Sequence, residues 1–346
     1  MRKIIVRILA TVLVLFAVLW FLQRLLVPKY VENIPEGSMI EEYYDTDKDT
    51  DVIFIGDCEV YENISPVTIW EKSGITSYIR GSSDQRIWQS YYLLKDTLEY
   101  QTPKVLVLSI LSLTEEECES EEYNRLTLDG MKWSETKVEA IKDSMLEEES
   151  FVSYLFPLLR YHDRWDQISS EDFKYFFSKP KVTTNGYLMQ VGVRGVTSLP
   201  RYPALGNYDF SEKTMSYLDK IRELCNEKGI QLCLYKGPSV YPHWYEEWDK
   251  QVVDYANKYG LVYINTANLA DTIGIDYTKD TFDYGQHLNV EGAEKLSAYI
   301  ALFLKDTYNL LDHKFDSEQV EKWEELKIRY YEEKEIKLKN WEETKE

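Results

Sequence analysis

The feature that most limits the fold of this chain is an alternation of short apolar runs with amphipathic helical patterns. A strand in a parallel sheet reads as a continuous run of branched apolar residues, because helices cover both of its faces. The runs are, in order, "DVIFIG" (51–56), "SYIRG" (77–81), "KVLVLSIL" (104–111), "IQLCLYKG" (230–237) and "LVYINTANL" (261–269). The alternation predicts an α/β domain over residues 51–312, in which a parallel sheet carries helices on both faces.

Two segments break this alternation. Residues 114–208 are polar, aromatic and irregular, with helix-like pieces, and we predict that they form a large insertion or helical cap over the sheet. Residues 313–346 are rich in charged helix formers with scattered aromatic residues. The favoured interpretation of this charged tail is a solvated helix or a frayed end, and a helix that binds a partner is the alternative.

The first thirty residues are the most apolar part of the chain. No charge occurs between Ile8 and Gln23, and Arg7 and Arg24 stand on either side, where their side chains can reach the two interfaces of a bilayer. About 20 helical residues cross the hydrocarbon core. The alternative is a cleaved signal peptide, but the region around Phe21 is bulky where a cleavage site needs small residues. We therefore predict a transmembrane anchor over residues 1–30.

Basic residues predict the orientation of this anchor. Three basic residues precede the span, at positions 2, 3 and 7, and two follow it, Arg24 and Lys29. Because the more basic flank stays in the cytoplasm, we expect a single-pass protein of the cell membrane whose globular domain is extracytoplasmic. Residues 31–50, rich in acidic residues, are expected to be a juxtamembrane linker.

Composition narrows the choice of partners. The net charge of −20 argues against a nucleic-acid partner, because phosphate binding needs a basic footprint. We find no metal-ligating cysteine spacing and no cofactor motif, so we expect neither metal nor cofactor. Cys225 and Cys233 are interpreted as core residues, with a disulfide between them as the alternative. Aromatic residues make up 14% of the chain; such rings stack on sugars but also fill cores, and both interpretations stay open.

Three segments place reactive groups at the carboxyl edge of the predicted sheet, where open α/β sheets bind ligands. Cys58 follows the first strand in "GDC", where a strand-to-helix turn exposes a side chain and free backbone N–H groups. Gly81 ends the second strand, and a glycine there lets the backbone donate an N–H to a reacting carbonyl. "DTFDYGQHLNVEG" presents Asp283 and His287 just before the last helix of the domain, where a base and its orienting carboxylate are needed.

On these motifs the chain resembles the SGNH/GDSL-type hydrolases, in particular their membrane-anchored, extracytoplasmic bacterial members, over roughly residues 50–310. The family's first motif is Gly-Asp-Ser with serine as nucleophile, and Cys58 stands at that position. Its last motif is Asp-x-x-His, often followed by Leu-Asn and a glycine, and "HLNVEG" matches it from His287 onward. The resemblance implies a three-layer, flavodoxin-like parallel sheet and acyl-ester hydrolysis or O-acyl transfer. It also implies a membrane-bound O-acyltransferase as a candidate partner.

The sequence departs from the family pattern at two places. Asp283 stands four residues before His287 instead of three, so we expect its carboxylate to contribute less to orienting the imidazole. The asparagine motif after the third strand is absent, since that region offers only Ser109 and Ser112. Asn124, in the insertion, is the candidate that could replace it in the oxyanion hole.

The segment after the fourth strand, "LYKGPSVYPHWYEEW", is expected to edge the same cleft. Lys236, Tyr241 and Trp244 are its candidates for a substrate groove. Arg80 and Arg86, together with Lys236, are the cations that an anionic glycan would require near the cleft.

Two functions follow from these residues. If Cys58 pairs with histidine it is a strong nucleophile, and the protein is then an acyl-ester hydrolase or O-acyltransferase acting on cell-envelope glycan. Free cysteine is also a common packing residue. In that case the protein is a catalytically lapsed accessory or glycan-binding protein of cell-envelope modification.

Overall fold

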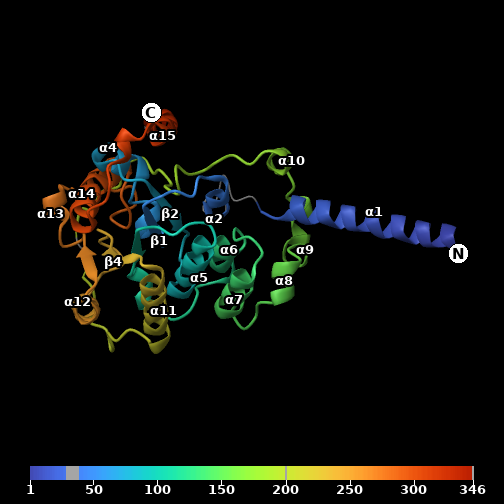
Figure 1. Cartoon of the computed structure of the whole chain (residues 1–346), viewed down its shortest axis with the longest axis horizontal. Coiled ribbons are helices and arrows are strands. Elements are labelled where there is room, and N and C mark those ends of the chain that lie inside the picture. Colours follow the sequence, from blue (N-terminus) through green and yellow to red (C-terminus); the bar gives the residue numbers. More distant parts are fainter. Residues whose placement is uncertain (29–38, 199–200, 345–346) are drawn as a thin grey trace.

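The centre of the molecule is a five-stranded parallel sheet with the strand order β2-β1-β3-β4-β5 (Figure 1). The structure is a computed structural model and describes residues 1–28, 39–198 and 201–344. The strands are β1 (Val52–Gly56), β2 (Ser77–Gly81), β3 (Val105–Ser109), β4 (Gln231–Lys236) and β5 (Val262–Asn265). This order is that of flavodoxin-like doubly wound sheets, and the predicted three-layer α/β fold is confirmed.

Alternate residues of each strand face two separate cores. Phe54 of β1 packs in the core beneath α4 (Pro66–Ser73) and α14 (Val290–Tyr308). Its neighbours Ile53 and Ile55 pack in the core on the other face, beneath α5 (Ile87–Leu98), α11 (Glu212–Lys228) and α12 (Glu246–Tyr259). Every residue of β1 is buried, as expected for the central strand of a sheet covered on both sides.

The helices begin and end where the sequence supplies caps. The Ser65 hydroxyl accepts a hydrogen bond from Thr68 N (3.2 Å) at the start of α4, and Gly74 ends that helix in the left-handed region. Asn289 caps α14 in the same manner, because its side chain accepts from Gly292 N at 3.2 Å. These caps fix the start of α14 directly after the segment that carries His287.

Helices make up the first part of the predicted insertion. They are α6 (Glu121–Leu128), α7 (Glu135–Ser144), α8 (Phe151–Leu155), α9 (Leu158–Tyr161) and α10 (Ser170–Phe177). Ala140 and Ile141 of α7 join the core beneath α5. Figure 1 shows α8, α9 and α10 farther out, beside the end of α1 (Arg2–Leu26) that is nearest the globular domain. The insertion therefore extends sideways from the sheet toward α1.

The C-terminal helix α15 (Ser317–Glu343) is docked on the domain rather than frayed. Trp323 stacks on Trp70 of α4 with ring centroids 5.1 Å apart, and Tyr330, fully buried, donates to Glu294 at 2.9 Å. These two aromatic residues are two turns apart on one face of α15. The charged composition predicted a solvated tail because it hides this narrow apolar stripe.

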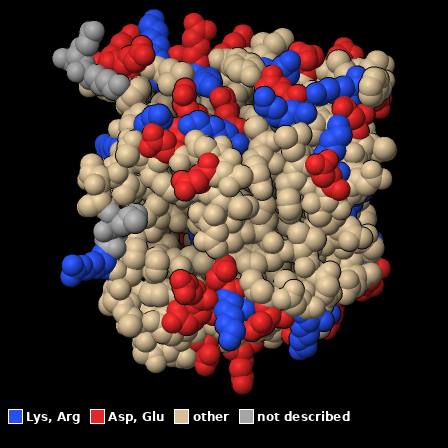
Figure 2. Space-filling view, turned by 90° about the vertical axis from the view of Figure 1, so that its left-hand side faces the viewer, with Lys and Arg blue, Asp and Glu red and all other residues tan. Residues whose placement is uncertain are grey.

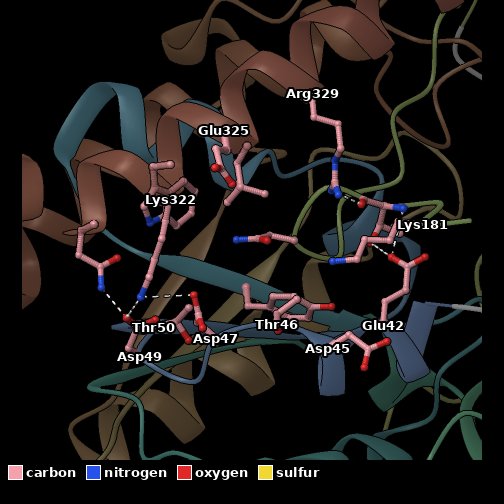
Figure 3. Close-up of a pocket in the computed structure, with 16 residues that line it drawn as sticks. Glu42, Asp45, Thr46, Asp47, Asp49, Thr50, Lys181, Lys322, Glu325 and Arg329 are labelled. Atoms are coloured by element: carbon pink, nitrogen blue, oxygen red, sulfur yellow. Dashed lines mark hydrogen bonds and ion pairs between the residues drawn. The ribbon is translucent and has the colours of Figure 1, made fainter. Parts of the chain in front are cut away.

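A cavity of about 340 Å³ lies between α15, residues 42–50 and residues 181–185 (Figure 3). Lys322 bridges Asp47 and Asp49, each at 3.3 Å, and Arg329 donates to the carbonyl oxygen of Thr183 at 2.6 Å. The cavity is thus crossed by the ion pairs and hydrogen bonds that hold α15 in place.

Part of the predicted linker belongs to the core. Helix α2 (Met39–Glu42) and a 3-10 turn over Tyr43–Asp45 bury Ile40 and Tyr43 almost completely. Apolar side chains among acidic neighbours explain the difference, because composition alone made this segment look like a tether. Residues 31–38 of the predicted linker lie outside the described residues.

Helix α1 is 25 residues long, and by length and composition it can cross a membrane. Its most apolar stretch has no contact that buries it within the molecule. Only Leu25 and Leu26, at its end, are buried.

Replacing Phe54 by aspartate tests the central position of β1. The change puts an unpaired charge where no part of the wild-type side chain is exposed, so we expect a loss of about 4 kcal/mol or more in the free energy of unfolding. Denaturant unfolding of the full chain measures this loss. Phe315→Asp is the matched control, since that ring is 94% exposed, and it should leave the midpoint unchanged. Equal midpoints for the two variants would contradict the strand assignment.

Candidate active site

The turn after β1 is shaped by a close approach of β1 and β3. A side chain at Gly56 would place its Cβ only 2.3 Å from the Cβ of Ser109, so glycine is required there. The carboxylate of Asp57 accepts from Glu59 N (3.0 Å) and from the Ser109 hydroxyl (3.2 Å). Burial, followed by the charge of Glu59, raises the pKa of Asp57 to about 7. The result is a short turn that delivers Cys58 at the carboxyl edge of the sheet.

A buried ion pair ties this turn to β4. Lys236 Nζ lies 2.5 Å from Glu59 Oε1, and neither side chain is more than 1% exposed. The second oxygen of Glu59 accepts from Gly237 N at 2.8 Å, and Ser239 donates to the first at 2.5 Å. Lys236, predicted to line the substrate groove, instead points into the protein, because its charge is neutralised there by Glu59.

His287 is held by two carboxylates. Its Nδ1 lies 2.6 Å from Asp283 Oδ2 and 3.2 Å from Glu62 Oε2, and its backbone N donates to Asp283 Oδ1 at 2.8 Å. Tyr284 and Gly285 adopt left-handed φ values of 65° and 94°. These two residues take up the extra position in the loop, so Asp283 reaches the imidazole. The expectation that Asp283 contributes less is therefore not supported by its placement.

Cys58 and His287 lie on the same cavity, and each side chain shifts the pKa of the other. Because Nδ1 faces the carboxylates, Nε2 is the nitrogen left for the thiol. Burial raises the pKa of Cys58 to about 11, although His287 pulls it down. Burial opposes a charged imidazole too, but the negative charge of Cys58 and the contacts to Asp283 and Glu62 outweigh it and raise the pKa of His287. We conclude that burial keeps the thiol protonated, whereas the carboxylates stabilise the imidazolium form of His287.

Cys58 and His287 line a cavity of about 330 Å³. Two of its side chains have buried polar atoms that lack a hydrogen-bond partner among the described residues: the hydroxyl of Ser112 and the Nε of Arg86. Arg86 also pairs with Asp84 at 2.7 Å. Orphaned buried donors at a cleft are suited to bind a developing negative charge.

Several predicted site residues lie away from this cavity. Gly81 ends β2 next to Gly56 and is not among the residues that line the cavity. Asn124 is fully buried in α6, where its amide contacts Gln89, the carbonyl oxygen of Ser144 and a carboxylate of the insertion. The oxyanion roles predicted for Gly81 and Asn124 are therefore not supported by their placement.

Two of the three cations predicted to lie near the cleft are also placed away from this cavity. Arg80 is buried in a pair with Asp96 at 2.7 Å, and Lys236 is paired with Glu59. Only Arg86 of the three lines the cavity. Trp244 is likewise absent from the lining and donates to a carboxylate of α12.

A second cavity, of about 370 Å³, continues from the first. Tyr241 and Gln286 line both, and Tyr202 and Tyr284 add two more aromatic walls to the second. Tyr241 and Tyr284 are 54% and 65% exposed, and His243 stacks on Tyr202 with a centroid distance of 4.0 Å. The predicted position of Tyr241 in a substrate groove agrees with this placement.

In the described part of the chain, no group of three or more His, Cys, Asp and Glu side chains is placed to hold a metal ion. All four cysteines are free thiols; Cys58 is half-buried, and the other three are buried. Cys225 and Cys233 lie in the two cores, on opposite sides of the sheet.

Comparison with known proteins gives fold likenesses only. No protein-family model matches the chain, and no curated protein sequence matches it. Several solved structures are similar to it, including two bacterial proteins. One is described as a lipolytic protein of the G-D-S-L family from Desulfitobacterium hafniense, with 12% identity and a TM-score of 0.38, covering 73% of this chain and 99% of the other. The second is a GDSL-like lipase from Bacteroides thetaiotaomicron, with 10% identity and a TM-score of 0.35, covering 77% and 95%. At these scores neither bears on the site, whose assignment rests on its own geometry.

Sequence reasoning missed Glu62. It stands four residues after Cys58, one helical turn on, and Gln190 from the insertion donates to it at 2.7 Å. The spacing of one turn from a candidate nucleophile was the available signal. Ser112 was noticed only as a poor replacement for asparagine, and its unpartnered hydroxyl is visible only in the structure.

Alkylation of the wild-type chain tests the pairing of Cys58 with His287. Iodoacetamide should modify Cys58 first, at a rate that rises with pH toward an apparent pKa of about 11. His287→Ala removes the partner that lowers the thiol pKa, so it should move the profile to higher pH. Mass spectrometry of the labelled peptide measures the rate, with the exposed His162→Ala as control. A profile unchanged by His287→Ala would remove the imidazole from contact with the thiol.

Proposed function

We propose that this protein is a membrane-anchored, extracytoplasmic acyl-ester hydrolase or O-acyltransferase that acts on cell-envelope glycan through Cys58 and His287. The observation that carries the proposal is the arrangement of thiol, imidazole and carboxylates at the mouth of a cavity on the carboxyl edge of the sheet. Nucleophile, base and orienting group stand in the order that acyl transfer requires.

The reaction proceeds in two halves. Sγ of Cys58 attacks the acyl carbonyl carbon while its proton passes to His287 Nε2, and the tetrahedral intermediate collapses to a thioester as the leaving alcohol takes that proton. Water, or a sugar hydroxyl in a transferase, then attacks the thioester carbon and gives its proton to His287. The thiolate leaves and recovers this proton. Asp283 and Glu62 stabilise the imidazolium in both halves.

Ser112 is the donor that we assign to the oxyanion. Ser112 is 4% exposed and lines the cavity, and its buried hydroxyl has no hydrogen-bond partner among the described residues. A hydroxyl can take the place of an asparagine amide, because both donate one hydrogen bond to the developing charge.

The second cavity supports a sugar as the acceptor or as the esterified group. Exposed tyrosine rings at Tyr241 and Tyr284 offer flat apolar faces next to the reacting groups. Among the charged residues of the first cavity, Asp84, Glu115 and Glu119 outnumber Arg86. A neutral or amino-bearing glycan fits this balance better than a phosphate-rich polymer.

The membrane location is supported by α1 and by the basic residues that precede its apolar stretch. Figure 2 shows the face that points away from α1, where acidic and basic side chains gather together around a broad uncharged band. The net charge of −20 therefore does not form a single acidic field on this face. A membrane-bound O-acyltransferase, which would supply acyl groups, is the partner that a transferase function requires, and it is part of this proposal.

The raised pKa of Cys58 favours a second candidate function. A thiol that stays protonated is a poor nucleophile, and the site would then serve a catalytically lapsed accessory protein that binds glycan through the aromatic cavity. The two candidates differ in one measurable quantity, turnover of an acyl ester.

Cys58→Ala should abolish turnover of acetylated sugar esters by the full chain, and His287→Ala should reduce it by orders of magnitude, since the nucleophile loses its base. Cys58→Ser tests whether the base and the oxyanion donor also activate a hydroxyl, and we expect measurable activity. Cys225→Ala, which removes a thiol far from the cleft, is the matched control and should retain activity. Turnover that survives Cys58→Ala would exclude the thiol mechanism, and wild-type protein that binds glycan without turnover would favour the accessory function.

Replacing the exposed tyrosines of the second cavity tests whether they bind a glycan substrate. The double variant Tyr241→Ser with Tyr284→Ser should raise KM for an acylated oligosaccharide about 10-fold, equivalent to ~1.4 kcal/mol. Its kcat/KM for a small soluble ester should stay unchanged. Tyr331→Ser, an exposed tyrosine on α15, is the control. Equal losses on both substrates would show that these tyrosines support the site rather than bind sugar.

A further inference from the structure

We propose that the exposed apolar side chains of α8, α9, α10 and the turn between them form a second membrane contact, which lies on the lipid surface beside α1. We call this set the membrane-side surface. It consists of Val152, Leu155, Phe156, Leu159, Trp165, Phe173 and Phe177. The proposal rests on the proposed membrane anchor and extends it, because it assigns a lipid partner to the insertion.

The first observation is direct contact between the insertion and the apolar helix. The ring of Phe176 in α10 lies 5.9 Å from Trp20 and 4.9 Å from Phe21, measured between centroids. The guanidinium of Arg24 sits 5.4 Å from the same ring. Arg164 donates to the carbonyl oxygen of Leu26 at 2.6 Å. These contacts bring α10 and the 3-10 turn over His162–Asp166 to the last two turns of α1 (Figure 1).

The second observation is the depth of these contacts. Trp20 and Phe21 precede the end of α1 by five or six residues, which is about 8 Å along a helix. If α1 crosses a bilayer, this level is the interface between hydrocarbon and headgroups, where tryptophan and other aromatic rings collect. Phe176 touches α1 at that level. The neighbours of Phe176 on α10 must then lie at the same lipid surface.

The third observation is exposure. Trp165 is 72% exposed and Phe177 83% exposed, and the other members of the membrane-side surface are at least 42% exposed. Large apolar side chains that gather on one part of a protein surface mark an interaction site, and here the adjoining surface is the apolar helix α1 itself. Because the membrane-side surface adjoins the apolar helix α1, we infer that its partner is the same lipid bilayer that α1 would cross.

The net charge of the segment that carries the membrane-side surface is compatible with a lipid partner. Residues 151–181 carry five basic and four acidic residues, whereas the whole chain has a net charge of −20. This segment is therefore spared the repulsion that anionic lipid headgroups would impose on most of the molecule.

The membrane-side surface is linked to the candidate active site. Arg160 of α9 pairs with Glu121 at 3.0 Å, and Glu121 also pairs with Arg125 at 2.8 Å within α6. Tyr123 of the same helix lines the cavity of Cys58. Contact with lipid would thus hold the cleft at a fixed height above the membrane.

A fluorescent label that reports polarity tests the proposal. Phe177→Cys is made in full-length Cys58→Ala protein, whose other cysteines are buried, and is labelled with a nitrobenzoxadiazole dye. In phosphatidylcholine vesicles its emission should shift to the blue and be quenched by doxyl-labelled lipid. Phe315→Cys, at a ring 94% exposed near α15, is the matched control and should show neither effect.

Flotation of the same vesicles separates the two proposals. A chain that does not float would overturn the anchor, and the second membrane contact with it. A chain that floats while the label at position 177 matches the control would overturn the membrane-side surface alone. A blue-shifted label that doxyl lipid fails to quench would mean that protein covers this surface, which also contradicts a lipid partner.

Discussion

The buried pair of Glu59 and Lys236 is the interaction on which the candidate site depends. Helix α3 (Cys58–Tyr61) is a single turn, too short to hold its own position. The carboxylate of Glu59 receives Lys236, Gly237 and Ser239 from the end of β4, so it fastens this turn to the neighbouring part of the sheet. Loss of one partner would leave an uncompensated buried charge, which costs several kcal/mol. Lys236 therefore helps to position Cys58 and does not face the cavity. Of the three predicted cations, Arg86 is the one that can contact a negatively charged substrate.

The site itself is assembled from segments far apart in the chain. β1 supplies the thiol, the loop before α14 supplies His287 and Asp283, and β3 leads to Ser112. Burial protects the thiol and keeps it neutral, while the carboxylates favour the charged imidazole. An imidazolium stabilised by these carboxylates would also offset the negative charge that develops on the reacting groups.

Sequence alone predicted the fold, and it predicted that Cys58 and His287 lie at one edge of the sheet, where the structure places both on one cavity. It failed where tertiary contacts decide the direction of a side chain. An uninterrupted apolar run such as the one around Phe54 predicts a buried strand directly. The positions of Cys58 and His287 could be predicted because Cys58 follows a strand and His287 precedes a helix. Lys236 could not be placed, because its direction depends on a carboxylate 177 residues away. The reach of Asp283 depends on left-handed backbone at Tyr284, a residue that rarely adopts it. Asn124 looked free because its partners come from three separate helices and turns.

The docking of α15 has a consequence for how the protein is made. Lys322 contacts Asp49 across 273 residues of sequence, and His313 contacts Asp51 across 262. The two ends of the globular domain therefore contact each other. Tyr330 belongs to the core beneath α4 and α14, and Trp323 stacks on Trp70 of α4. These contacts cannot form before α15 has been synthesised. Until then the core residues that α15 covers are exposed, so the domain completes its folding only after nearly all of it has been made.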